Sequence, residues 1–244
     1  MSPRAPEVAA VNAAKVESAL ALLRQAQSLA SAVFSSSFGA EDMVLFDMIR
    51  RHGLEIGIFT LDTGRLPEET HALMQRVEER YGRCFDILYP DTQEVQALVA
   101  RNGINGFYES VDKRKACCAV RKVAPLRKAL AGKRAWVTGL RARQSAARAA
   151  LVAREFDQEY QLDKFNPLHD WTEAEVWAYV REHDVPYNVL HDRFYPSIGC
   201  APCTRAIAVG EDVRAGRWWW ENTEAKECGL HPAGHKTIPL QVSA

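Results

Sequence analysis

The stretch "SAVFSSSFGAED", residues 31–42, decides the expected fold. Its apolar start is typical of a short buried strand, and the serines and glycine that follow indicate a polar turn. The next segment, "MVLFDMIRRHG" at residues 43–53, has the pattern of a helix that ends at Gly53. A strand that passes through a turn of small residues into a helix is the repeating unit of an α/β fold.

The same alternation continues along the chain. A helical pattern covers residues 8 to 30, and another starts at Pro67, placed in its first turn. A capping box of Thr172 and Glu175 opens a further helix, "DWTEAEVWAYVREHDVP" at residues 170–186. Further strands are expected at residues 56–64, 85–90 and 134–141. The sequence therefore predicts an α/β fold with a parallel twisted sheet covered by helices on both faces.

Composition limits the classes of partner. The chain has 244 residues with 31 Lys and Arg against 31 Asp and Glu, so no global field favours nucleic acid or a membrane. It lacks the apolar run of a signal peptide or a membrane span, which predicts a cytoplasmic protein. We expect a domain over residues 1–210 and a C-terminal tail over residues 211–244.

Four cysteines form two pairs that are far apart in the sequence. "RKACCAVRK" (residues 114–122) carries Cys117 and Cys118, and "YPSIGCAPCTRA" (residues 195–206) carries Cys200 and Cys203. Each pair alone could be packing or a surface turn, but together they make a four-thiolate set that suits zinc or an iron–sulfur cluster. Neighbouring cysteines fit a single tetrahedral ion poorly, whereas a 4Fe–4S cube offers each of them its own iron corner.

Two other segments carry chemistry. In "SSSFGAED" (residues 35–42) small residues allow close approach to a ligand, and the following helix N-terminus presents N–H groups to an anion. The alternative is an ordinary turn, with Asp42 or a serine as N-cap. Basic residues gather around the predicted strand ends and thiols, and although each could be a solvated charge, their grouping favours a polyanionic substrate. They are Arg121, Lys122, Arg141, Arg143, Arg148, Arg214 and Arg217.

Cys228 stands alone in "EAKECGLHPAGH", residues 224–235. Lys226 and His231 would favour its thiolate and Glu227 would oppose it. A solvent-facing cysteine without a role is the alternative. Trp218–Trp220 are expected to pack the tail onto the domain rather than to form a docking surface, and Cys84 is expected to be plain packing.

With these residues in place, the chain resembles the sulfonucleotide reductase family, in its adenylyl-sulfate (APS) branch. The resemblance rests on "SSSFGAED", "LDTG" (residues 61–64), "CC" followed by "C-x-x-C", and "ECGLH" (residues 227–231), in the family's order over about residues 30–235. It implies an adenine-nucleotide alpha-hydrolase-like fold with a mobile C-terminal tail. The stretch "RARQSAAR" (residues 141–148) is shorter than the commoner family spacing.

The resemblance also implies the roles of the residues. Cys117, Cys118, Cys200 and Cys203 would hold a 4Fe–4S cluster, and Cys228 would be the nucleophile. The implied substrate-binding residues are Ser35, Ser36, Ser37, Gly39, Asp42, Leu61, Asp62, Thr63, Gly64, Lys122, Gly139, Leu140, Arg148, Arg214, Arg217 and His231.

The implied reaction is the reduction of APS to sulfite and AMP in sulfate assimilation. The Cys228 thiolate would form an S-sulfocysteine, and thioredoxin or a glutaredoxin-like thiol donor would release sulfite. The resemblance does not decide whether the chain forms a homo-oligomer. The alternatives are a reductase of the 3′-phosphorylated analogue (PAPS), an ATP-dependent adenylating relative, and a zinc-stabilised module without catalysis.

The cluster hypothesis predicts a colour. Protein purified without air is expected to be brown, with broad absorbance near about 400 nm from thiolate-bound iron. Absorbance spectra with iron and zinc analysis test this. A colourless protein with one zinc ion would instead support the zinc-stabilised module.

Overall fold

The fold is built around a twisted sheet. The computed structural model describes residues 12–145, 148–221 and 237–239, and these residues form a seven-stranded sheet of order β3-β2-β1-β4-β6-β5-β7. The strands are β1 (Ala32–Ser35), β2 (Gly57–Leu61), β3 (Asp86–Leu88), β4 (Ala135–Val137), β5 (Arg154–Asp157), β6 (Leu162–Phe165) and β7 (Thr237–Pro239). Strand β1 lies between β2 and β4, where Val33 pairs with Gly57 and with Trp136.

The α/β class is confirmed, but the sheet is not wholly parallel. Strands β3, β2, β1, β4 and β6 run parallel, whereas β5 is antiparallel to both β6 and β7. The expectation of a parallel sheet was wrong for this edge. Residues 158–161 alone join β5 to β6, and a connection this short makes a hairpin, since a parallel crossover needs about a dozen residues or more.

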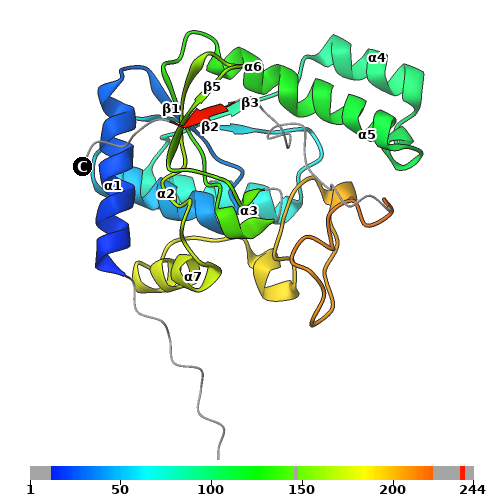
Figure 1. Ribbon diagram of the computed structural model, residues 1–244. Coiled ribbons are helices and arrows are strands. Elements are labelled where there is room, and N and C mark those ends of the chain that lie inside the picture. Colours follow the sequence, from blue (N-terminus) through cyan, green and yellow to red (C-terminus); the bar gives the residue numbers. More distant parts are fainter. Residues whose placement is uncertain (1–11, 146–147, 222–236, 240–244) are drawn as a thin grey trace, which may run out of the picture.

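Helices cover both faces of the sheet (Figure 1). Apolar residues of α1, α2, α3 and α7 pack with Phe34, Ile58 and Val137 on one face, and Leu126 and Leu130 of α6 pack on the other. The helices are α1 (Ala13–Ser28), α2 (Ala40–Arg51), α3 (Glu68–Tyr81), α4 (Thr92–Asn102), α5 (Val111–Cys118), α6 (Ala124–Leu130) and α7 (Glu173–Glu182). Within the described residues, no helix is long and apolar enough to span a membrane.

The strongly patterned elements agree with the sequence. The capping box of Thr172 and Glu175 starts α7, and α2 begins directly after Gly39. Pro67 is the N-cap of α3 rather than a residue of its first turn. The sequence did not predict α4, α5 or α6. Helix α4 has no buried residue, and α5 has a strongly polar sequence.

Residues 189–221 form an irregular segment, shown in yellow to orange on the same side of the molecule as α5 (Figure 1). Arg217, Trp218 and Glu221 are buried and pack onto the rest of the structure, whereas residues 211–213 are exposed. Strand β7 then brings the chain back to the sheet beside β5. Residues 222–236, which include Cys228 and His231, lie outside the described residues.

A buried carboxylate ties three helices together beneath the sheet. Asp47 of α2 accepts hydrogen bonds from Tyr81 of α3 at 2.7 Å and from Tyr179 of α7 at 2.9 Å. Arg51 donates to the same carboxylate from its Nε at 3.0 Å. Burial raises the pKa of Tyr179 and the neighbouring Asp47 adds to the effect, so this hydroxyl stays protonated and remains a donor.

This junction predicts a stability effect. Tyr179→Phe removes one donor to a buried carboxylate and should lower the free energy of unfolding by about 1–3 kcal/mol. Urea unfolding measures the change. Tyr187→Phe is the matched control, because the Tyr187 hydroxyl bonds to Asp192 at the exposed surface, and it should change little. Equal effects of the two substitutions would contradict the assignment.

Candidate active site

The serine-rich turn is held by its own helix. Phe38 is fully buried in the core with a φ of 59°, which fixes the turn between Ser37 and Gly39. The carboxylate of Asp42, in the first turn of α2, accepts hydrogen bonds from the Ser37 backbone N–H and from the Ser37 hydroxyl at 2.7 Å. The N-cap of α2 is Gly39, with no side-chain capping bond, so neither Asp42 nor a serine caps the helix. The helix N-terminus therefore faces the turn without a side-chain cap.

A cavity of about 910 Å³ lies at this end of the sheet. It is large for a small-molecule site, since such sites commonly enclose about 300–1,000 Å³. Most of the predicted substrate-binding residues line it, and they come from five separate segments. These are Ser35, Ser36, Ser37, Gly39, Asp42, Leu61, Thr63, Lys122, Gly139, Leu140, Arg148, Arg214 and Arg217.

Asp62 and Gly64 are not among the lining residues. The Asp62 carboxylate points into its own turn, where it accepts a hydrogen bond from the Gly64 N–H at 2.8 Å and lies 2.8 Å from Nε2 of His71. Asp62 therefore shapes the turn after β2, while Leu61 and Thr63 face the cavity. His231 lies outside the described residues.

Gly139 is needed at the end of β4. A Cβ at this position would lie 2.1 Å from Oδ1 of Asp42, far closer than any real contact. Any larger residue would displace Asp42 and with it the bonds to Ser37. The glycine thus allows the turn after β4 and the serine-rich turn to approach each other.

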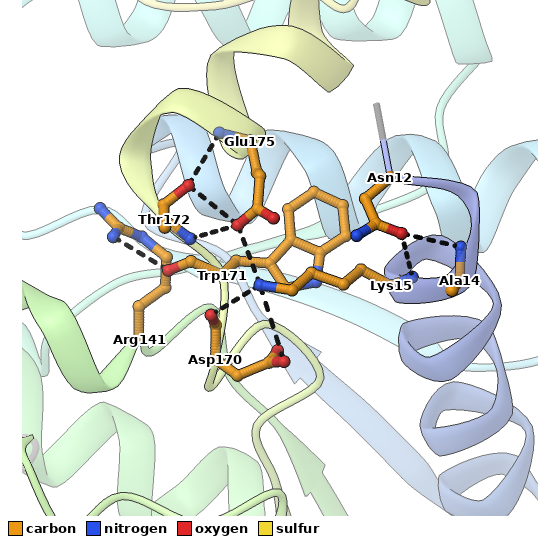
Figure 2. A network of polar contacts seen from close by, with 8 residues as sticks. All are labelled: Asn12, Ala14, Lys15, Arg141, Asp170, Trp171, Thr172 and Glu175. Carbon is orange, nitrogen blue, oxygen red and sulfur yellow. Dashed lines mark hydrogen bonds and ion pairs between the residues drawn. The ribbon is translucent and has the colours of Figure 1, made fainter. Parts of the chain in front are cut away.

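Not every basic residue near the cavity can bind a ligand. Arg141 is buried, and its guanidinium forms an ion pair with Glu41 at 2.6 Å. It also donates to the backbone oxygen of Trp171 at 3.4 Å (Figure 2). Arg141 therefore stabilises the wall of the cavity. Its guanidinium is already paired within the protein, which does not favour the expected role in anion binding.

The sequence did not predict that α7 reaches the site, yet Thr172, Glu173 and Ala174 line the cavity. Figure 2 shows what holds this helix end. Lys15 of α1 donates to Glu175 at 3.0 Å and to the backbone oxygen of Asp170 at 2.9 Å. The capping box marked the helix start, but nothing local in the sequence indicated which cavity it faces.

The four paired cysteines lie together around a second, smaller cavity. Cys117 and Cys118 end α5, directly before a π-helical turn (Ala119–Val123), and Cys200 and Cys203 flank a single 3-10 turn (Ala201–Cys203). The π turn carries Arg121 and Lys122, and such turns are frequent at functional sites. The cavity is also lined by Arg65, Phe107, Arg114, Arg121, Lys122, Pro202, Arg217 and Trp218.

The two cavities have a common wall. Lys122, Arg217 and Trp218 line both of them. The hydroxyl of Thr63, which faces the larger cavity, also lies 3.2 Å from the sulfur of Cys200. An anion bound in the larger cavity would therefore share its cationic neighbours with the thiols.

The thiols are in an unusual environment. Burial raises the pKa of the Cys117 thiol, with Arg121 opposing the rise, and burial raises the pKa of Cys203 to about 11. In the same cavity, the Nε atoms of Arg121 and Arg217 and the indole N–H of Trp218 are buried and have no hydrogen-bond partner among the described residues. Buried donors are nearly always satisfied, so this cavity suits an occupant rich in acceptors.

These features fit a thiolate-bound cluster. A 4Fe–4S cube with four thiolates is anionic overall, and its sulfur atoms accept hydrogen bonds from donors such as these. Among the described residues, no three Cys, His, Asp or Glu side chains are close enough to hold a single metal ion.

Three comparisons bear on the family. Residues 31–206 match the model of the phosphoadenosine phosphosulfate reductase domain. An adenosine 5′-phosphosulfate reductase of Allochromatium vinosum is 58% identical over 235 residues, covering 93% of this chain and 92% of that one.

Solved structures agree with the fold. A phosphoadenylyl-sulfate reductase from Candida auris, in a phosphate complex, is 26% identical with a TM-score of 0.67, covering 82% of this chain and 100% of that one. The FMN adenylyltransferase of Candida glabrata, in complex with FAD and pyrophosphate, has a TM-score of 0.54 at 12% identity, covering 79% and 66%, and shares the fold alone.

The buried carboxylate of the serine-rich turn predicts a pH effect. Burial raises the pKa of Asp42 from 3.8 to about 6, although the bonds from Ser37 oppose the rise. A raised pKa means that folding favours the protonated form. The stability that Asp42 contributes is therefore complete below about pH 4 and is lost as the pH rises through about 6.

Asp42→Asn removes this titration. The free energy of unfolding of the variant, relative to the unchanged protein, should rise between about pH 4 and pH 7. Urea unfolding of both proteins at several pH values measures the difference, in which all other titrating groups cancel. A difference that is constant over this range would contradict a raised pKa.

Proposed function

Since the chain belongs to the phosphoadenosine phosphosulfate reductase domain family, we propose that the two joined cavities carry out the reduction of APS to sulfite and AMP. The high identity to a named APS reductase over nearly the whole of both chains supports APS as the substrate. One structural observation carries the site assignment. Lys122 and Arg217 stand between the nucleotide-sized cavity and the four thiols, where a phosphosulfate and a cluster would both need positive charge.

The larger cavity would bind the nucleotide. The uncapped N-terminus of α2 suits the anionic end of APS. The turn before it is held in place by the two hydrogen bonds that Ser37 donates to Asp42. Apolar side chains of Phe59, Leu61 and Trp136 line the same cavity and suit the adenine ring. The sequence did not single out Phe59 or Trp136, because both looked like ordinary core residues of strands.

Positive charge would assist the chemical step. Lys122, Arg148, Arg214 and Arg217 line the cavity from three segments. Cations fixed around the phosphosulfate offset the repulsion between its charge and an approaching thiolate. They also stabilise the phosphate oxygen that leaves with AMP.

The nucleophile of the proposal is Cys228. Its thiolate attacks the sulfate sulfur, so that an S–S bond forms, the S–O bond to the phosphate breaks, and AMP departs with that electron pair. A thiol of a donor such as thioredoxin then attacks the Cys228 sulfur and sulfite leaves. A second donor thiol breaks the mixed disulfide. The two electrons of the reduction therefore come from thiols.

Cys117, Cys118, Cys200 and Cys203 would hold a 4Fe–4S cluster. When bound, such a cluster supplies a fixed acceptor-rich group beside Lys122, and the donors of Arg121, Arg217 and Trp218 would bond to it. None of the five described cysteines forms a disulfide, and we place the reaction in the reducing cytoplasm on that basis.

The proposal predicts a covalent intermediate. Without a thiol donor, the enzyme mixed with APS should gain the mass of one SO3 group on Cys228, and Cys228→Ser should abolish both the adduct and sulfite formation while its iron content stays unchanged. Mass spectrometry of peptides and iron analysis measure these outcomes.

Cys84→Ser is the matched control. Cys84 lines neither cavity, so this variant should form the adduct and release sulfite at the normal rate. Normal turnover by Cys228→Ser, or an adduct on another cysteine, would refute the role of Cys228.

A further inference from the structure

A buried ion pair joins two distant segments beside the cysteine cavity. Nε of Arg114 donates a hydrogen bond to Oε1 of Glu221 at 2.7 Å, and Nη2 of Arg114 donates one to Oε2 at 2.9 Å. The two side chains are only 2% and 3% exposed. Two parallel bonds between a guanidinium and a carboxylate fix direction as well as distance. The pair therefore allows Glu221 little freedom relative to α5.

A tryptophan strengthens this contact. The ring of Trp218 lies between two guanidinium groups, 4.6 Å from that of Arg114 and 4.7 Å from that of Arg217. The Trp218 backbone has a φ of 44° and its N–H donates to the Cys203 oxygen at 3.3 Å. The Glu221 N–H in turn donates to the Trp218 oxygen at 2.9 Å. Side-chain and backbone contacts thus hold Glu221 against both cysteine-bearing segments.

The positions of Arg114 and Glu221 in the sequence connect this ion pair to two of the cysteines. Arg114 precedes Cys117 by three residues on α5, so the two lie on neighbouring parts of one helix face. Glu221 is the last described residue before the segment that contains Cys228. Six residues lie between Glu221 and Cys228, and the seven steps from one Cα to the next span at most about 25 Å. The place where the chain leaves Glu221 therefore limits where the Cys228 sulfur can arrive.

We propose that Arg114 and Glu221 are a positioning pair that fixes the point from which the Cys228 segment leaves the domain, and that this fixed point sets the rate of S-sulfonation. The inference rests on the proposed function of Cys228. Neither residue lines the larger cavity, so the pair acts on the approach of the sulfur and not on the binding of the nucleotide.

The test separates positioning from stability. Glu221→Gln keeps the shape of the side chain but removes the negative charge that pairs with Arg114, and it should lower the melting temperature. The double variant Arg114→Met with Glu221→Leu leaves no charge buried and unpaired, and its melting temperature should recover toward that of the unchanged protein. Iron-loaded protein is used throughout.

The rate of S-sulfonation is the decisive measurement. Quenched single-turnover mixing with APS, followed by mass spectrometry, should show adduct formation on Cys228 slowed about tenfold or more in both variants, because small misplacements of reacting groups are costly. APS affinity, measured by equilibrium binding in the Cys228→Ser background, should not change. The same double substitution at the exposed pair Arg127 and Glu159 is the control and should leave the rate unchanged.

Each outcome has a distinct meaning. A double variant that keeps its iron and forms the adduct at the unchanged rate overturns the inference, since the pair then serves stability alone. Loss of iron in both variants would mean that the pair stabilises the cysteine cavity, and this result also overturns the inference. If the unchanged protein forms no adduct on Cys228, the proposed function fails instead, and this inference fails with it.

Discussion

The proposed site depends on a wall of positive charge between two cavities, in which Arg217 is buried and Lys122 is half-buried. Lys122, Arg217 and Trp218 line both the nucleotide-sized cavity and the cavity of the paired cysteines. Buried cations and N–H groups are costly without partners, so each side of this wall requires an anionic or acceptor-rich neighbour. In the proposed function, thiolates on one side and a phosphosulfate on the other would meet the requirement together. The overall balance of charge in the chain conceals this local concentration.

The sequence was most informative where a local pattern carries its own physical cause. The serine-rich turn, the glycine at the end of β4 and the capping box of α7 were all recognisable, because small residues, strand ends and caps have short-range signatures. The hairpin of β5 and β6 was missed because both strands are short and the loop between them has no typical turn sequence. Helices α4 to α6 were missed because α4 buries no residue, α5 is strongly polar and α6 is only seven residues long.

The same limit applies to the site. Four cysteines could be grouped by residue type, and the structure places them around one cavity. The charges were harder to assign, since Arg141 and Arg148 looked alike in the sequence. Only the fold shows that Arg141 forms an ion pair with Glu41 and a hydrogen bond to the Trp171 backbone oxygen. The fold likewise shows that Asp62 contacts His71. Which partner a charged side chain finds is decided by segments far away in the sequence.

Strand β7 has a consequence for the segment that carries Cys228. Glu221 is held by Arg114 and Thr237–Pro239 pair with β5, so the described structure fixes the residues on both sides of positions 222–236. A chain closed at both ends keeps its residues within a bounded volume, and the entropy of that closure changes only slowly with length, by about 0.6 kcal/mol for each doubling. The tether therefore tolerates changes in loop length far better than the loss of either attachment. A C-terminal truncation that removes β7 would therefore remove the second of the two attachments, the one that lies beyond the Cys228 segment in the sequence.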